Sequence, residues 1–96
     1  MVVEMLTFEV APSERDAWLS VEEQVWSRFL EAQPGFVRKE MWVSSDNPVS
    51  VHAVIWWESL EQWKAITPAQ VADVDARMGE WFRDATVQAF DMVRDC

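Results

Sequence analysis

The stretch from Val49 to Trp57 constrains the fold more than any other part of the chain. It reads Val-Ser-Val-His-Ala-Val-Ile-Trp-Trp, and β-branched and aromatic residues stand on both of its alternating faces. This composition is typical of a strand that is buried on both sides and lies in the middle of a sheet. Each face of that sheet therefore needs a cover.

A helix is predicted directly after this strand. Ser59 can accept a hydrogen bond from the free backbone N–H groups that follow, and Gln62 can reach back, which is the capping-box pattern. The same signals recur at Thr67, where Pro68 takes the first helical position and Gln70 completes the box. We expect a short helix over residues 59–66 and a second one that begins at residue 67.

The remaining segments complete an alternating order of strands and helices. Strands are predicted over residues 2–10, 36–45 and 86–93, and turn residues 44–48 make the second and third strands a hairpin. A helix is expected from Ser13, capped with Asp16, with an apolar stripe and with Glu22 on its solvent face. The order β-α-β-β-α-β predicts a ferredoxin-like α+β fold over residues 1–96 as one domain, a four-stranded antiparallel sheet with helices on one face.

The other face of that sheet is too apolar to be left in water. Half of the residues are hydrophobic, with seven Trp and five Phe, which is more large apolar surface than a small monomer easily buries. Two sheets packed face to face would close a barrel. The sequence therefore predicts a homodimer in which a second copy covers the open face.

The charge excludes several classes of partner. The net charge of −9 disfavours binding to nucleic acid or to an anionic membrane.

No apolar run is long enough to span a bilayer and no secretory signal is expected, so a cytoplasmic location is predicted. The single cysteine, Cys96, fits a reducing compartment. We expect it to have no structural role, with an intersubunit disulfide as the alternative.

Several short motifs resemble a known superfamily. Pro34-Gly35-Phe36, and Ile55-Trp56-Trp57-Glu58-Ser59 before a helix that carries aromatic residues, are similar to motifs of the dimeric α+β barrels, and within them to antibiotic-biosynthesis-monooxygenase-type domains. Glu4, the Lys39–Trp42 stretch and the Gln62–Lys64 stretch also resemble a small, mainly cyanobacterial family without an assigned activity. The resemblance implies either a monooxygenase of quinol-like substrates that needs no cofactor, or a dimer without chemistry.

A haem-degrading branch of the same superfamily is not favoured. Its pattern requires an asparagine on the first strand, a tryptophan on the third strand and a histidine on the following helix. Trp57 matches the tryptophan, but Leu6 stands near the asparagine position and residues 59–85 contain no histidine. We therefore expect no haem.

Three residues are candidate catalytic bases. His52 is the only histidine and has the side chain best suited to proton transfer near neutral pH, although a lone strand histidine is more often simply packed. Glu4 and Glu40 each interrupt an apolar strand, and burial in a dry cavity would raise the pKa of either carboxyl. The plainer alternatives are an ion pair of Glu40 with Arg38 or Lys39, and a frayed strand end for Glu4.

Aromatic side chains are the candidate ligand contacts. By resemblance, Phe8, Trp42 and Trp57 are expected to line a barrel cavity for a flat apolar ligand. Alternation places Phe36, Arg38, Glu40 and Trp42 on one face of their strand. Asp73 and Asp75 are expected to be solvated, and one histidine and one cysteine are too few for a metal site built on those residues.

The sequence is compatible with three functions. The chain is a small enzyme, a non-catalytic dimer that binds a ligand, or a purely structural dimer. An RNA-recognition module shares the order of elements, but eight Lys and Arg against seventeen Asp and Glu exclude the basic surface that it needs.

Overall fold

The predicted β-α-β-β-α-β order is confirmed. The computed structural model describes residues 1–95; Cys96, and with it the question of its role, lies outside this range. In chain order the elements are β1 (Val2–Glu9), α1 (Arg15–Glu22), the π-helix η1 (Glu23–Ser27), α2 (Arg28–Glu31), β2 (Phe36–Val43), β3 (Ser50–Trp57), α3 (Leu60–Lys64), α4 (Pro68–Arg77), the 3₁₀ helix η2 (Gly79–Trp81) and β4 (Thr86–Asp91).

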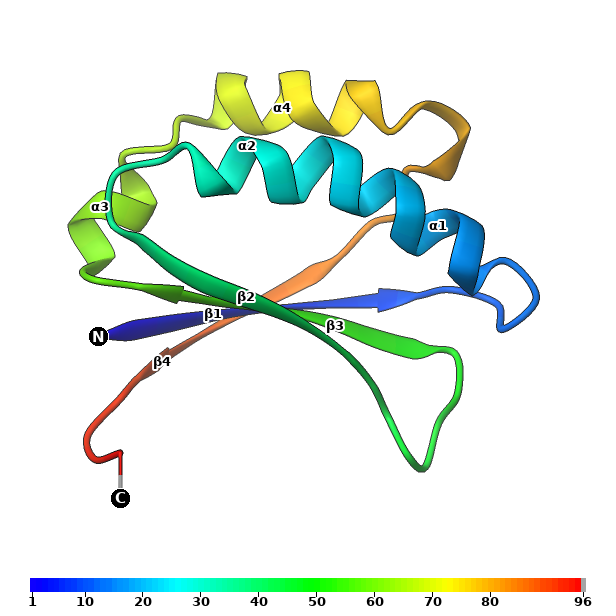
Figure 1. The fold of residues 1–96 in the computed structure, drawn as a ribbon, viewed down its shortest axis with the longest axis horizontal. Helices are drawn as coiled ribbons and strands as arrows, with labels where there is room; N and C mark the ends of the chain where they lie inside the picture. Colours follow the sequence, from blue (N-terminus) through cyan, green and yellow to red (C-terminus); the bar gives the residue numbers. More distant parts are fainter. Residues whose placement is uncertain (96) are drawn as a thin grey trace.

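The sheet has the ferredoxin-like strand order. Its four strands are ordered β2-β3-β1-β4, and all neighbouring pairs are antiparallel. The helices lie together on one face of this sheet, and no element among residues 1–95 covers the other face (Figure 1). This arrangement is the α+β fold that the sequence predicts.

The central strand β3 is fully buried on its helical face and only partly buried on its open face. Val54 is 0% exposed and its neighbour Ile55 is 2% exposed, although successive side chains of a strand point to opposite faces. Ile55 and Trp57 pack with Leu30 and Trp63 of the helices, so the odd-numbered residues of β3 face the helical layer. The even-numbered residues, His52 among them, face the open side.

Two of the three predicted helix caps are confirmed. The Ser59 hydroxyl accepts the Gln62 backbone N–H, and Thr67 and Gln70 form a complete capping box with Pro68 in the first turn. The predicted cap at Ser13 is wrong. The N–H of Glu14 closes a turn onto the Ala11 carbonyl at 2.9 Å, and α1 then begins at Arg15 without a side-chain cap.

The first helix departs from its predicted solvent face. Glu22 follows Trp18 by four residues and so shares its face, where Glu22 is only 3% exposed. The wider π-helical turn of η1 follows directly, and Ser27 at its end is also buried. The expectation that Glu22 is solvated was wrong because Lys39 of β2 neutralises it inside the fold.

A register irregularity divides β2. The pairing with β3 shifts between Phe36 and Arg38, so the strand does not alternate through this point. Phe36 packs edge-on against Trp57 on the helical side, with ring centroids 6.1 Å apart. Phe36 therefore does not share a face with Arg38, Glu40 and Trp42, as uninterrupted alternation predicted.

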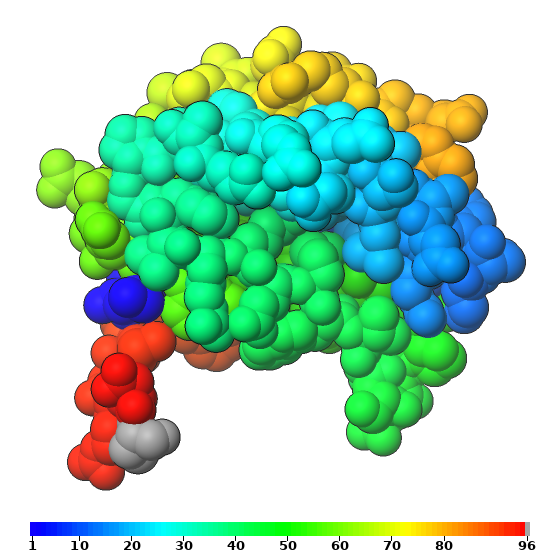
Figure 2. Space-filling model, viewed as in Figure 1, coloured from blue at the N-terminus to red at the C-terminus, as the bar shows by residue number. Residues whose placement is uncertain are grey.

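The open side of the sheet is concave. Figure 2 shows the β2–β3 turn and the C-terminal segment projecting away from the helices, with a recess between them. Several large apolar side chains of these strands are exposed, among them Trp42 (43%) and Phe90 (46%). Among residues 1–95, no helix has the length and apolar character required to cross a membrane.

Candidate functional site

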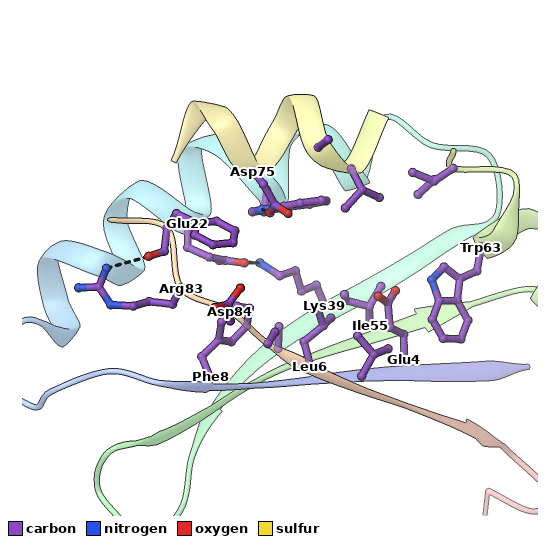
Figure 3. A pocket seen from close by; sticks show the side chains of 18 of the residues that line it. Glu4, Leu6, Phe8, Glu22, Lys39, Ile55, Trp63, Asp75, Arg83 and Asp84 are labelled. Atoms are coloured by element: carbon purple, nitrogen blue, oxygen red, sulfur yellow. Dashed lines mark hydrogen bonds and ion pairs between the residues drawn. The ribbon is translucent and has the colours of Figure 1, made fainter. Parts of the chain in front are cut away.

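A pocket of about 770 Å³ lies between the sheet and the helical layer. Figure 3 shows side chains from β1 and β3 below it, α4 above it and the segment before β4 at one side. The sheet contributes Glu4, Leu6, Phe8, Lys39, Ala53, Ile55 and Val87. The helices contribute Glu22, Trp26, Trp63, Lys64, Pro68, Val71, Ala72 and Asp75. The remaining lining residues lie in connecting segments and are Ile66 and residues 82–85. The walls are mainly apolar, which suits a small apolar ligand.

Glu4 is the carboxylate on the floor of this pocket. The register of β1 and β3 pairs Glu4 with Ile55 and Val2 with Trp57, so Glu4 and Trp57 are diagonal neighbours on the helical face. The Trp57 indole N–H donates to Glu4 Oε1 at 3.0 Å. Burial raises the pKa of the Glu4 carboxyl, and this bond and the Lys64 charge oppose the rise only in part.

A second carboxylate, Asp75, enters the pocket from α4. The Trp26 indole N–H donates to Asp75 Oδ1 at 3.2 Å. Burial raises the pKa of Asp75, the bond from Trp26 lowers it and the nearby charge of Asp84 raises it. The prediction that Asp75 is solvated is therefore wrong, whereas Asp73 is exposed as expected.

A buried ion pair closes another wall. The Lys39 ammonium donates to Glu22 Oε1 at 2.7 Å and to the Ser27 hydroxyl at 2.6 Å, and the side chains of Lys39 and Glu22 are 7% and 4% exposed. Burial raises the pKa of Glu22, and the Lys39 charge opposes that rise. The sequence analysis did not predict this pair. The only signal in the sequence was that Lys39 shares a strand face with the apolar Met41, which indicates a lysine among apolar neighbours.

The structure brings together half of the residues that the sequence singled out. Glu4 and Phe8 line the pocket, and the fully buried Trp57 stands directly behind Glu4. They come together because β1 and β3 are neighbours and present these positions to the same face.

Glu40, His52 and Trp42 lie on the opposite, open face. Trp42 Nε1 donates to Glu40 at 3.0 Å and Arg38 pairs with Glu40 at 2.9 Å, which matches the plainer alternative for Glu40. His52 Nδ1 is 2.9 Å from the Thr7 hydroxyl. The sheet separates these three residues from the pocket, which lies on its helical side and not in the barrel space where a ligand was expected.

The polar groups that line the pocket are carboxylates, indoles and cationic side chains. No histidine lines it, and residues 1–95 contain no group of three or more His, Cys, Asp or Glu arranged to hold a metal ion. Two of its carboxylates, Glu4 and Asp75, are half-buried in a mainly apolar cavity.

Comparison with solved structures shows the same fold. MhuD from Mycobacterium tuberculosis, a heme-degrader with two hemes bound in its active site, is 23% identical with a TM-score of 0.78, covering 100% of this chain and 99% of that one. SnoaB, a cofactor-independent oxygenase from Streptomyces nogalater, is 21% identical with a TM-score of 0.72, covering 98% and 94%. The ActVA-Orf6 monooxygenase of Streptomyces coelicolor, in complex with Nanaomycin D, is 15% identical with a TM-score of 0.79, covering 99% and 89%.

Family assignment rests on the sequence itself. A search of curated proteins finds no significant match. The profile of the family described as "Antibiotic biosynthesis monooxygenase" matches residues 1–68, which include β1, β3 and the Glu4–Trp57 pair. The chain belongs to the antibiotic biosynthesis monooxygenase family.

Proposed function

We propose that the pocket between the sheet and the helices binds a flat, apolar phenol-like molecule and that Glu4 removes its acidic proton. The observation that carries this proposal is a carboxylate with a raised pKa in an apolar pocket, fixed by the Trp57 indole. A raised pKa makes Glu4 a stronger base than an exposed glutamate, which suits proton abstraction near neutral pH. The family membership favours an oxygenation as the following step.

The proposed reaction balances without a cofactor. Glu4 takes the phenolic proton, and the electron-rich phenolate reacts with O2 at a ring carbon that carries hydrogen. The resulting peroxide anion takes up a proton, and the hydroperoxide so formed loses water, which leaves a second carbonyl. A phenol and O2 thus give a quinone and water, and the substrate supplies every electron. The anion forms in a pocket that also contains the buried Lys39 charge.

We further propose that a second copy of the chain covers the open face. Trp42 and Trp56 form an edge-on pair there with centroids 6.4 Å apart, and the Arg38 guanidinium lies 4.2 Å from the Trp56 ring. Such aromatic and arginine side chains are typical anchors of protein interfaces. In this assignment Glu40, His52 and Trp42 serve the interface and not the chemistry.

Oxygen uptake with fused-ring phenols tests the catalytic proposal. Wild-type protein is expected to consume one O2 for each quinone formed, without hydrogen peroxide. Glu4→Gln is expected to lower the rate at least about 100-fold, the scale of a lost general base. Glu40→Gln and His52→Ala, both on the other face, serve as controls and are expected to keep the rate.

Two results would contradict this assignment. Loss of activity in Glu40→Gln but not in Glu4→Gln would move the base to the open face. Tight binding of the phenols without any oxygen uptake would support the alternative function, a non-catalytic ligand-binding dimer.

A further inference from the structure

The end of the pocket near Asp75 contains a polar arrangement that Glu4 does not use. A side cavity of about 10 Å³ lies beside the main pocket and shares six lining residues with it: Phe8, Glu22, Trp26, Asp75, Phe82 and Arg83. This space is roughly what one water-sized group requires. Trp18 also lines it, and Trp18 is 0% exposed.

The Trp18 side chain, which lines this cavity, carries an unpaired indole N–H. Within residues 1–95 its Nε1 atom is buried and has no hydrogen-bond partner. A buried donor without a partner costs about 1–3 kcal/mol, so such groups are normally paired with a water or a ligand. The Trp18 ring is held against Phe8, with centroids 4.9 Å apart, and does not depend on a hydrogen bond for its position.

Asp75 supplies the matching acceptor. Its Oδ1 atom is held by Trp26, and no protein donor reaches its other oxygen, Oδ2, within the described residues. A hydroxyl group is the simplest chemical group that both accepts from an N–H and donates to a carboxylate. An ether or halide lacks the donor. A carboxylate or phosphate would be repelled by Asp75 and Asp84, because the Arg83 guanidinium at the cavity is already paired with Glu14 at 3.0 Å.

From this geometry we propose that Trp18 and Asp75 form a hydroxyl-recognition subsite, so that the preferred ligand is a flat neutral molecule with one hydroxyl group near Glu4 and another at the Asp75 end. Figure 3 shows Glu4 and Asp75 on different walls of the pocket, Glu4 from the sheet and Asp75 from α4. Asp75 is a specificity-determining residue in this proposal. The inference rests on the proposed function, because it assigns a ligand class to the same pocket.

Anaerobic titration tests this subsite without turnover. Calorimetry compares naphthol with dihydroxynaphthalenes that carry one hydroxyl on each ring. Wild-type protein is expected to bind at least one such diol about tenfold or more tightly than naphthol, the effect of one hydrogen bond to a charged group. Asp75→Ala is expected to reduce this preference to within about twofold. Asp73→Ala, an exposed aspartate on the same helix, is the matched control and is expected to retain the preference.

A second variant tests whether the Trp18 indole N–H donates to the ligand hydroxyl. Trp18→Phe keeps an aromatic ring beside Phe8 but removes the N–H, and it is expected to weaken diol binding more than naphthol binding. Equal binding of naphthol and all diols, or a diol preference that survives Asp75→Ala, would overturn the subsite and leave the proposed function intact. Failure of wild-type protein to bind naphthol or any diol would overturn both.

Discussion

The indole N–H of Trp57 donates to Oε1 of Glu4 across 3.0 Å, between the two central strands of the sheet. Trp57 is fully buried, so this bond satisfies an indole that has no access to water. It also holds one carboxylate oxygen in place and leaves the other to the pocket. The Trp57–Glu4 pair therefore belongs both to the packed core and to the proposed active site.

The raised pKa of Glu4 predicts a pH dependence of stability. Its pKa in the fold lies above the ordinary value of 4.5, so the native state holds this proton more tightly than the unfolded state does. The resulting stabilisation is fully present below pH 4.5 and is lost as the pH rises through the raised pKa. Glu4→Gln removes this loss, so the stability of the variant relative to wild type is expected to increase between pH 4 and pH 8.

Urea unfolding at several pH values measures this effect. Glu9→Gln removes a negative charge from an exposed position on the same strand and controls for the change in net charge. If the two variants differ from wild type by the same pH-independent amount, Glu4 is not the group that titrates.

The buried pair of Lys39 and Glu22 predicts strong coupling. Lys39→Met leaves the Glu22 carboxylate buried without a counter-charge and is expected to cost about 3–5 kcal/mol of unfolding free energy. The double variant Lys39→Met, Glu22→Leu removes both charges and is expected to recover most of that loss. Chemical denaturation of both single variants and the double variant gives the coupling energy. Additive effects would show that the pair is not energetically linked.

The exposed apolar side chains on the open face of the sheet predict that the protein is a homodimer. Native mass spectrometry of wild-type protein is expected to give about twice 11.2 kDa. Trp42→Glu places a negative charge beside Glu40 on this face, and we expect it to shift the protein to monomer. Leu60→Glu changes an equally exposed apolar residue on α3 and is expected to leave the dimer intact. A monomeric wild type would contradict the proposed barrel.

A comparison of Gly35 and Gly79 separates two costs of a glycine-to-alanine change, namely backbone strain and a steric clash of the new Cβ. Both have positive φ, +86° and +59°, so alanine strains the backbone at either position by about 1–2 kcal/mol. A Cβ at Gly35 would also lie 2.6 Å from Cβ of Gln62, whereas Gly79 faces open space. Gly35→Ala is therefore expected to lower the melting temperature more than Gly79→Ala. Equal losses would show that Gln62 moves aside at little cost.

The sequence by itself determined the order of elements and the central strand. The caps at Ser59 and Thr67 and the central place of β3 in the sheet follow from side-chain chemistry and periodicity over a few neighbouring residues. These local signals survive in the fold. The family motifs around Pro34 and Trp57 are likewise short runs of consecutive residues that can be recognised without the tertiary structure. The cap at Ser13 failed because a turn through Ala11 and Glu14 forms there instead.

Only the tertiary structure decided which of the candidate residues share a site. Glu4 and Glu40 both interrupt an apolar strand, but pairing across the sheet sends Glu4 to the helical pocket and Glu40 to the open face. A shift of one residue in register, such as the irregularity after Phe36, exchanges the faces of a strand, and no local pattern fixes it. The pairs Lys39–Glu22 and Trp26–Asp75 likewise join residues 17 and 49 positions apart, so their burial follows from packing and not from the residues' own character.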